Sequence, residues 1–271
     1  MNKASSSIEW QMESRSISVI IPALNEAEHI GACIESAKKL NPVEIIVADG
    51  GSSDRTREVA EDAGALLIQS PKGRGIQMNR GASVAKGKML LFLHADTIIS
   101  NEISSLCHPE LVGTTLREDS PRYSGSEEML KRLSEENQHD KTEILDKYIG
   151  GFFKLEFDDD SIAIRLVEIF ANLRARLFSL PYGDQAIFIK KVIFKETGGF
   201  KEYPFLEDID MAIRVRKFGK LKYVPLRVVA SSRRLRKCYP LSPVFVSLRN
   251  VLITLLFLFG LSPSRLVKLY K

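Results

Sequence analysis

The first hundred residues alternate short apolar runs with amphipathic segments, and this alternation constrains the fold more than any other feature. Apolar runs rich in β-branched residues and leucine predict buried strands at Ile17–Ile21, Glu44–Ala48, Ala65–Gln69 and Met89–Leu93. Helical patterns between them start near Glu26, cover Asp54–Ala63 and run through Met78 to Ala85. Strands joined through helices by short loops predict an α/β fold, with a mostly parallel central sheet flanked by helices.

Local signals place the ends of the first two helices. Asn25 is a preferred residue type for capping the first helix, and Ser52 or Ser53 is suited to cap the second. Gly64 follows the second helical pattern and marks its end.

The second half of the chain continues the same kinds of element. We expect strands at Gly150–Phe157, Ala186–Ile189, Leu221–Val224 and Arg227–Ala230, and helices at Ile162–Leu180 and Leu206–Phe218. Apolar residues recur at helical spacing in the first of these helices and predict one buried face: Ile162, Leu166, Ile169, Phe170, Leu173 and Leu177. The phenylalanines are spaced like core residues: Phe152, Phe153, Phe157, Phe170 and Phe178.

Composition shifts suggest how the chain is divided. Residues 1–15 form a polar, flexible leader, and residues 16–240 form the main domain. Residues 117–147 are acidic and poor in apolar residues, which indicates an insertion or mobile loop. Residues 241–271 form a basic and apolar helical extension. Its apolar run, Val244–Leu261, is interrupted by Arg249 and Asn250 and favours a core or interfacial helix over a membrane span.

Charge is distributed unevenly along the chain. The net charge is +5, from 39 Lys and Arg against 34 Asp and Glu. From Met211 to Lys271 there is no acidic residue but there are fourteen cations, so the first 210 residues sum to −9. This asymmetry predicts a polyanionic ligand or surface near the C-terminal end. Aliphatic runs beside the cations favour a membrane or lipid phosphate over a nucleic acid.

The cysteines and the N-terminal residues bear on location. Cys33, Cys107 and Cys238 are an odd, scattered set, which indicates a reducing compartment rather than a disulfide framework. The N-terminal residues lack the apolar stretch of a signal peptide. We therefore expect a cytoplasmic protein, with peripheral contact at the cytoplasmic face of the membrane as an option.

Polar residues follow the first, second and fourth predicted strands. Asn25, Asp49 and Asp96 all come at carboxyl ends of strands, which meet at one edge of a parallel sheet. Asp49 precedes Gly50 and Gly51, and an acid followed by glycines and a capped helix suits a nucleotide. A turn with no ligand is an equally good explanation of this segment.

Two further segments suit phosphate chemistry. Lys72–Gly81 opens with glycines and cations ahead of a helix, as in a phosphate cradle, although a plain turn is an equal alternative and the spacing is not that of a Walker A motif. His94-Ala95-Asp96 follows a buried strand. Its carboxylate is suited to hold a divalent cation that bridges phosphate oxygens, and the alternative is a polar strand end facing solvent.

Taken in order, these segments resemble a known family. SVIIPALNE, VADGGSSDRT, GRGIQMNRGA, FLHAD and FLEDIDMAIRVRKFG look like the inverting family-2 glycosyltransferases of the GT-A fold. PYGDQAIF and ASSRR sharpen the resemblance to the subgroup called "transferase 2, radical-SAM/selenodomain-associated", which is linked to arsenosugar biosynthesis. The resemblance covers about residues 17–116 and 150–270.

The resemblance implies roles for individual residues. Asp208, in Glu207-Asp208, would be the general base, and Asp96 would be the metal-binding member of a DxD-like motif for Mg²⁺ or Mn²⁺. The implied nucleotide-sugar-binding residues are Pro22, Asn25, Glu26, Asp49, Gly50, Ser52, Arg74, Gln77, Asn79, Ala95, Asp96, Asp184, Gln185, Arg233 and Arg234. His94 stands where the family usually has an acidic residue, and imidazole suits Mn²⁺ better than Mg²⁺.

Elementary chemistry gives these residues a mechanism. An acceptor hydroxyl must lose its proton as it attacks the anomeric carbon, and the leaving diphosphate develops charge that cations stabilise. We expect Asp208 to take the proton, and Arg74 with Arg233 or Arg234 to face the diphosphate. The alternatives are an acid that stabilises a helix N-terminus at Asp208 and a solvated basic turn at the two adjacent arginines.

Two other classes of function compete with glycosyl transfer. A sugar-phosphate nucleotidyltransferase would carry its Gly-rich loop after the first strand, whereas here that loop follows the third. A non-catalytic protein that binds the membrane surface through its basic C-terminal part is the other alternative, and no nucleic-acid partner is expected. The acceptor is a hydroxyl compound that is either lipid-linked or small.

Overall fold

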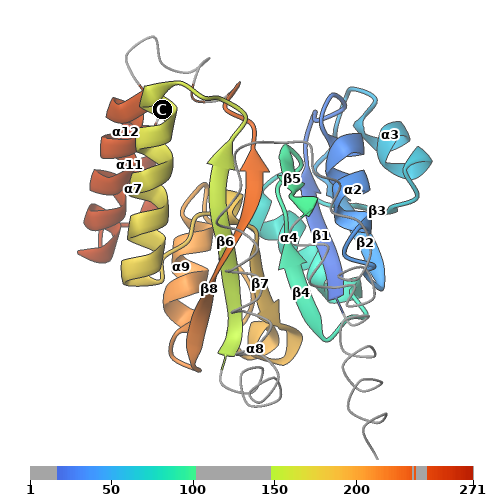
Figure 1. Cartoon of the computed structure of the whole chain (residues 1–271). Helices are drawn as coiled ribbons and strands as arrows, with labels where there is room; N and C mark the ends of the chain where they lie inside the picture. Colours follow the sequence, from blue (N-terminus) through green and yellow to red (C-terminus); the bar gives the residue numbers. More distant parts are fainter. Residues whose placement is uncertain (1–16, 102–147, 234, 236–242, 271) are drawn as a thin grey trace, which may run out of the picture.

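The protein is described by a computed structural model, in which residues 17–101, 148–233, 235 and 243–270 are described. The proposed leader at residues 1–15 and the acidic stretch 117–147 lie outside these residues, and so do Arg234, Cys107 and Cys238. Figure 1 shows a central sheet with helices on both faces and a separate layer of three helices at one side. The expected α/β class is confirmed.

One eight-stranded sheet, in the order β3-β2-β1-β4-β7-β6-β8-β5, forms the centre of the molecule. Its strands are β1 (Ile17–Ala23), β2 (Glu44–Asp49), β3 (Leu66–Gln69), β4 (Met89–Phe92), β5 (Thr97–Ile99), β6 (Tyr148–Phe157), β7 (Ile187–Lys190) and β8 (Lys220–Ala230). The first four are parallel to one another, as expected from the helices that connect them. The strands expected at Leu221–Val224 and Arg227–Ala230 are one strand, β8, whose pairing with β6 shifts register between them.

β7 is the element that joins the two halves of the sheet. It pairs antiparallel with β4 on one side and with β6 on the other. Phe92, at the end of β4, is opposite Ile187, at the start of β7. The residues that follow β4 and those that precede β7 therefore meet at the same edge of the sheet.

Two apolar clusters cover the two faces of the sheet. Alternate residues of β1 divide between them: Ile20 packs with Met78 of α4 on one face, and Val19 packs with Ile34 of α2 on the other. This is the period-2 alternation of a strand buried on both sides. The helices are α2 (Ile30–Lys38), α3 (Thr56–Asp62), α4 (Arg74–Val84), α7 (Ile162–Phe178), α8 (Lys191–Glu196), α9 (Glu207–Val215), α11 (Pro243–Leu258) and α12 (Pro263–Tyr270), with a short 3₁₀ turn, η2 (Gly183–Gln185).

The predicted capping residues of the first two helices are wrong. α2 begins at Ile30 after His29, and Asn25 instead adopts a left-handed backbone (φ 56°) in the loop. α3 begins at Thr56 after Arg55, because Asp54 accepts the Thr56 N–H at 3.0 Å while Ser52 bonds elsewhere. Gly64, with φ 73°, follows the last residues of α3 as expected.

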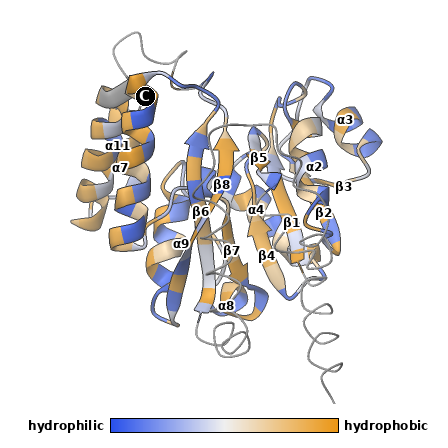
Figure 2. Ribbon diagram, viewed as in Figure 1, coloured by the Kyte–Doolittle hydropathy of each residue, from blue (hydrophilic) through white to orange (hydrophobic). Residues whose placement is uncertain are grey.

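The side of α7 that faces the protein differs from the prediction. Its buried residues are Ile164, Val167, Glu168, Ala171 and Ala175. The apolar residues expected inside are exposed instead, Ile162 by 81% and Phe170 by 50%, and Phe178 is exposed as well. Phe152 is buried as expected. α7 therefore has apolar residues on both its buried and its exposed side. Figure 2 shows α7 and α11 next to each other, with hydrophobic residues in orange along both helices.

Candidate active site

The loops after β1 and β2 are fastened to each other at the carboxyl edge of the sheet. The Asn25 N–H donates to Ser52 Oγ at 2.9 Å, and the Ser53 N–H donates to Asn25 Oδ1 at 2.9 Å. The Glu26 N–H donates to Thr56 Oγ1 at 2.8 Å. Asn25, Glu26 and Ser52 are therefore brought together as predicted, and they fix the shape of this part of the edge.

Asp49 is buried at the end of β2, with only 1% of its surface exposed. Its carboxylate accepts the N–H groups of Gly51 at 3.1 Å and Ser52 at 3.1 Å. These bonds hold the turn at Gly50, and Gly51 takes a positive φ of 92°. Asp49 thus organises the glycine turn, and any bond to a nucleotide uses the remaining acceptor capacity of its carboxylate.

Gln77 and Asn79, both predicted to bind nucleotide-sugar, are engaged with the backbone. Gln77 Nε2 donates to the carbonyls of Ala23 at 2.7 Å and Ala48 at 2.8 Å, so it ties the ends of β1 and β2 together. Asn79 bonds both backbone groups of Phe200, at 2.8 Å each. The structure therefore gives both amides a positioning role.

Asp96 and Glu26 share a cation. The Arg233 guanidinium pairs with Glu26 Oε2 and lies 3.6 Å from Asp96 Oδ2. The side chains of Glu26 and Asp96 are 8% and 9% exposed, so burial strengthens both interactions. This arrangement brings together residues from the first, fourth and last strands. Arg234 lies outside the described residues.

A second acidic group lies at the start of α9. Arg74 Nε, at the start of α4, pairs with Glu207 Oε1 at 2.8 Å, while Glu207 Oε2 is buried and has no hydrogen-bond partner among the described residues. Asp208 accepts the Gly183 N–H at 2.6 Å and the Ile209 N–H at 2.7 Å. The structure thus brings Glu207, Asp208 and Arg74 together, and it pairs Arg74 with Glu207, whereas we expected Arg74 to face the diphosphate together with Arg233 or Arg234.

Burial controls the protonation of two of these acids. It raises the pKa of Glu207 to about 6, opposed by Arg74 and reinforced by repulsion from Asp208. The pKa of Asp184 in η2 is also raised, mainly by burial and further by Asp208. Acids of this kind in a cleft are typical of catalytic sites, although ion-pair networks also produce them.

His94 connects the two acidic groups. It follows β4, two residues before Asp96, and a Cβ atom at Gly183 would overlap its imidazole. Gly183 in turn donates to Asp208. A small cavity of about 10 Å³, roughly the room for one water molecule, is lined by His94, Gly183, Glu207 and Asp208 together with Met78, Phe92, Ile187 and Phe200.

The metal prediction for Asp96 and His94 has limited support in the described residues. Within residues 17–101, 148–233, 235 and 243–270, no group of three His, Cys, Asp or Glu side chains is arranged to hold a metal ion. Mg²⁺ commonly binds through one or two carboxylates together with substrate phosphates. Asp96 fits that mode of binding, whereas His94 lies against Gly183.

Sequence reasoning missed the residues that fasten η2. Tyr182 Oη lies 2.8 Å from Thr254 Oγ1 in α11, and Arg174 of α7 lies over the Tyr182 ring at 3.3 Å. Gln185, predicted to lie beside the sugar, is fully buried and bonds the backbone at Phe153 and Tyr182. No short motif marks Arg174 or Thr254, because these contacts depend on how the helices pack. Pro22 and Ala95 are buried within the same edge.

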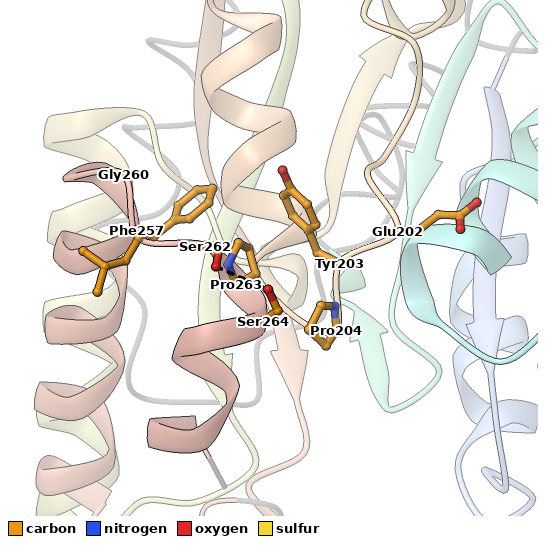
Figure 3. A pocket seen from close by; sticks show the side chains of 9 residues that line it. Glu202, Tyr203, Pro204, Phe257, Gly260, Ser262, Pro263 and Ser264 are labelled. Carbon is orange, nitrogen blue, oxygen red and sulfur yellow. Dashed lines mark hydrogen bonds between the residues drawn. The ribbon is translucent and has the colours of Figure 1, made fainter.

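A larger groove of about 470 Å³ lies at the turn between α11 and α12, and Figure 3 shows its lining. Tyr203, in the loop before α9, and Phe257, in α11, have their rings 6.4 Å apart. No residue that we predicted for the site lines this groove.

Comparison with known proteins agrees with the resemblance at the level of family and fold. Residues 18–106 match the model of Glycosyl transferase family 2. A PGL/p-HBAD biosynthesis glycosyltransferase of Mycobacterium bovis is 37% identical over 94 residues, which are 31% of this chain and 37% of that protein. Glucosyl-3-phosphoglycerate synthase of Mycolicibacterium smegmatis is 31% identical over 121 residues, covering 40% of this chain and 39% of that protein.

Solved structures extend the likeness to most of the chain. Glucosyl-3-phosphoglycerate synthase from Mycobacterium tuberculosis, in complex with Mn²⁺, UDP and glucosyl-3-phosphoglycerate, has a TM-score of 0.54 at 20% identity, over 92% of this chain and 85% of that one. S. aureus TarS in complex with UDP has a TM-score of 0.51 at 14% identity, over 94% and 69%.

The sequence comparisons cover less than half of this chain, whereas the structural comparisons cover most of it. The alignments to the first two curated relatives span less than two fifths of those proteins, and likeness at 14% and 20% identity concerns the fold alone. Residues 18–106 therefore match the family-2 glycosyltransferase model, and the described chain has the α/β architecture of GT-A glycosyltransferase structures.

Proposed function

We propose that the protein is an inverting glycosyltransferase that moves a sugar from a nucleotide-diphosphate sugar to an acceptor hydroxyl. The main observation in support is that His94 links two groups of polar residues at the same edge of the sheet. Asp49, Asp96 and Arg233 form the donor group, and Asp208 belongs to the acceptor group. His94 links them, since it is two residues from Asp96 and lies against the glycine that binds Asp208.

The donor group suits a nucleotide diphosphate. Asp49 and the glycine turn that it holds offer a carboxylate and close backbone approach to a base or ribose. Arg233 has 27% of its side chain exposed at this edge, so the guanidinium N–H groups that do not face Glu26 and Asp96 are suited to donate to diphosphate oxygens. That the solved relatives were crystallised with UDP supports this class of donor.

A divalent cation fits this site if it binds with the nucleotide. Asp96 would hold it together with diphosphate oxygens, and the ion would supply positive charge to the leaving group. The solved relatives crystallised with Mn²⁺ or Mg²⁺ and UDP support this choice of cofactor.

Asp208 is the proposed base. Its two backbone hydrogen bonds fix the carboxylate at the rim of the small cavity, and it is 9% exposed. There it takes the proton of an acceptor hydroxyl as that oxygen attacks the anomeric carbon. A single base and a direct displacement invert the anomeric centre. Glu207 supports the site through Arg74.

Other parts of the proposal concern the subgroup, the acceptor and the location. The segments PYGDQAIF and ASSRR support the radical-SAM/selenodomain-associated subgroup linked to arsenosugar biosynthesis. The acceptor is a hydroxyl compound, lipid-linked or small. The buried free thiol of Cys33 is consistent with a reducing, cytoplasmic location.

The test begins with a thermal-shift panel of UDP-, GDP- and TDP-sugars with Mg²⁺ or Mn²⁺, followed by a transfer assay that measures release of the nucleoside diphosphate. We expect Asp208→Asn to lower transfer by at least about a thousandfold and to change nucleotide affinity only a fewfold. Glu196→Gln, which changes an exposed acid outside the site, is the control and should transfer normally.

Three results would contradict the proposal. Transfer that survives Asp208→Asn would remove Asp208 as the base. Release of pyrophosphate instead of a nucleoside diphosphate would favour the nucleotidyltransferase alternative. If no nucleotide-sugar changes the melting temperature, the result would favour the alternative of a non-catalytic protein that binds the membrane surface.

A further inference from the structure

An apolar surface covers the outside of the helical layer made by α7, α11 and α12, which stand side by side in Figure 1. Fifteen large apolar side chains of this layer and its connecting turn are at least 38% exposed. We call them the outer face: Ile162, Leu166, Ile169, Phe170, Leu173, Leu177, Phe178, Phe245, Leu248, Leu252, Leu255, Leu258, Phe259, Leu261 and Leu269. Because these helices pack side by side, their exposed apolar side chains offer a surface of the kind that marks an interaction site.

The outer face is held outward by contacts on the opposite side of the same helices. Ile253 and Thr254 of α11 are 1% and 4% exposed, and Leu266 of α12 is 1% exposed. Tyr182 Oη bonds Thr254 Oγ1 at 2.8 Å, which fixes the rotation of α11 about its axis. Turning the outer leucines inward would therefore break an existing buried interface.

The charges around this face identify the kind of partner. α7, α11 and α12 together carry six cations and one acid, and that acid, Glu168, is buried and paired with Arg165. The cations are Arg165, Arg174, Arg176, Arg249, Arg265 and Lys268. Arg165 is paired with Glu168 and Asp160, and Arg174 packs over Tyr182 on the inner side. The charge beside the outer face therefore comes mainly from the exposed Arg176, Arg265 and Lys268. Exposed Arg216 adds a cation at the end of α7, since it donates to the Phe178 carbonyl at 2.9 Å. Two acids border this layer: Asp160 pairs with Arg165 just before α7, and Glu202 lines the groove at the turn between α11 and α12.

An apolar surface with a cationic surround matches the interface of an anionic bilayer. Leucine and phenylalanine side chains enter the boundary between headgroups and acyl chains, and arginine and lysine contact the anionic headgroups. A second copy of the chain is disfavoured, because a symmetric contact would bring the same cationic face against itself. Among the described residues, no helix has the length and apolar character required to cross a bilayer.

We propose that the outer face docks the protein on the surface of a membrane that contains anionic phospholipid. The binding needs neither the sugar donor nor Asp208. The expectation from sequence assigned such contact to residues 241–271 alone, and the structure adds α7 as half of the surface.

The experiment is vesicle co-sedimentation of the full chain without nucleotide. Vesicles of phosphatidylcholine with 30 mol% phosphatidylglycerol are compared with vesicles of phosphatidylcholine alone. We expect the chain to sediment with the anionic vesicles, to bind pure phosphatidylcholine at least about tenfold more weakly, and to be released by 0.5 M NaCl.

Matched variants distinguish binding through the outer face from non-specific binding through other exposed apolar residues. The triple variant Leu173→Gln, Leu252→Gln and Leu255→Gln changes side chains that are 47–54% exposed, and we expect about tenfold weaker binding. The control, Leu66→Gln, Val84→Gln and Val192→Gln, changes apolar residues exposed by 44–63% elsewhere and should bind like the unchanged chain. Arg265→Gln with Lys268→Gln should weaken only the binding to anionic vesicles.

Three outcomes would overturn the proposal. The first is a chain that stays in the supernatant with anionic vesicles. The second is equal sedimentation of the outer-face variant and its control, with circular dichroism showing both folded. The third is a dimer, detected by light scattering, that the outer-face variant dissociates, since this would assign the face to a second copy. Each result is independent of whether the protein transfers sugar.

Discussion

At the scale of single residues, the site is organised by charges that share partners. Arg74 pairs with Glu207, and Arg233 lies between Glu26 and Asp96. Removing the cation that is paired with a buried acid, or changing the charge of that acid, should alter the free energy of unfolding strongly. Little water is present at a buried pair to solvate the charge that is left. Two predictions belong to this scale.

The first prediction concerns Glu207 and pH. Its pKa rises from the ordinary 4.5 to about 6 on folding, so between these values the folded protein binds more protons than the unfolded chain. The contribution of Glu207 to the free energy of unfolding should therefore fall by on the order of 2 kcal/mol as pH rises from 4 to 7. Glu207→Gln should remove this slope, as measured by urea unfolding, and Glu196→Gln should keep it. Parallel curves for Glu207→Gln and the unchanged protein would contradict the assignment.

The second prediction concerns Arg233. Arg233→Ala removes the cation between two nearly buried acids and should destabilise the fold by about 2 kcal/mol. Mn²⁺ should raise the melting temperature of this variant more than that of the unchanged protein, because the ion replaces the lost charge. Arg55→Ala is the control, since Arg55 pairs with Glu58 on the surface with 76% of its side chain exposed. An equal Mn²⁺ effect on all three proteins would count against the role of Arg233.

At the scale of elements, η2 carries the contact between the two groups of the site. It precedes β7, places Gly183 against His94, and offers the Gly183 N–H to Asp208. Tyr182, just before it, anchors the turn to α11. A change within this short turn should therefore affect the reaction more than the fold.

The third prediction is a test of this turn. Gly183→Ala places a methyl group in the space of the His94 imidazole, so it should shift the N–H away from Asp208. We expect transfer to fall at least about tenfold with nucleotide affinity within a fewfold, as expected for an altered acceptor side. Adding His94→Ala should restore part of the loss if the overlap is its cause, and a double-mutant cycle measures this coupling. Strictly additive losses would refute the explanation.

Elements also show how far the sequence can be interpreted. The strands β1, β2 and β4 were predictable because they are buried on both faces and read as continuous apolar runs. The placement of Asn25, Asp49 and Asp96 at one edge followed from strand ends alone, because β1, β2 and β4 are parallel, whereas the role expected of Asp208 came from the resemblance. The backbone bonds of Gln77 and Asn79 in α4 could not be predicted, because a polar residue near the start of a helix has the same sequence signature whether it binds a ligand or a backbone carbonyl.

The orientation of α7 was not predictable for a related reason. Its strongest apolar stripe faces outward, and a weaker stripe with Ala171 and Ala175 packs on the protein. Periodicity identifies an apolar face but not what covers it. The short alanines let α7 approach its neighbours closely, a feature that a search for large apolar residues overlooks.

At the scale of the whole molecule, one sheet and one apolar cluster unite the two halves of the chain, before and after the segment between Ile99 and Tyr148. Ile20 and Ile46 of the first half share a cluster with Ile187 and Ile209 of the second. The backbone joins them through β4 and β7, paired from Met89 opposite Lys190 to Phe92 opposite Ile187. The match to the family model covers only the first half, although the fold is continuous across both.

The fourth prediction follows from this unity. Heating should unfold the protein in a single calorimetric transition, because neither half can lose its structure without exposing the shared cluster. A bound nucleotide-sugar should raise the temperature of that whole transition, although it contacts mainly the first half. Two resolved transitions, of which only the lower or the upper responds to nucleotide, would show that the halves unfold separately.

The antiparallel place of β7 has a consequence for how this chain tolerates change in length. The β4–β7 ladder sets the distance between His94 and Gly183, and a slip of two residues would move them apart by about 6.6 Å. β5 and β6 are each fixed separately on β8. The spacing of His94 and Gly183 therefore does not depend on the length of the sequence between Ile99 and Tyr148. Insertions and deletions in that sequence should leave this spacing unchanged.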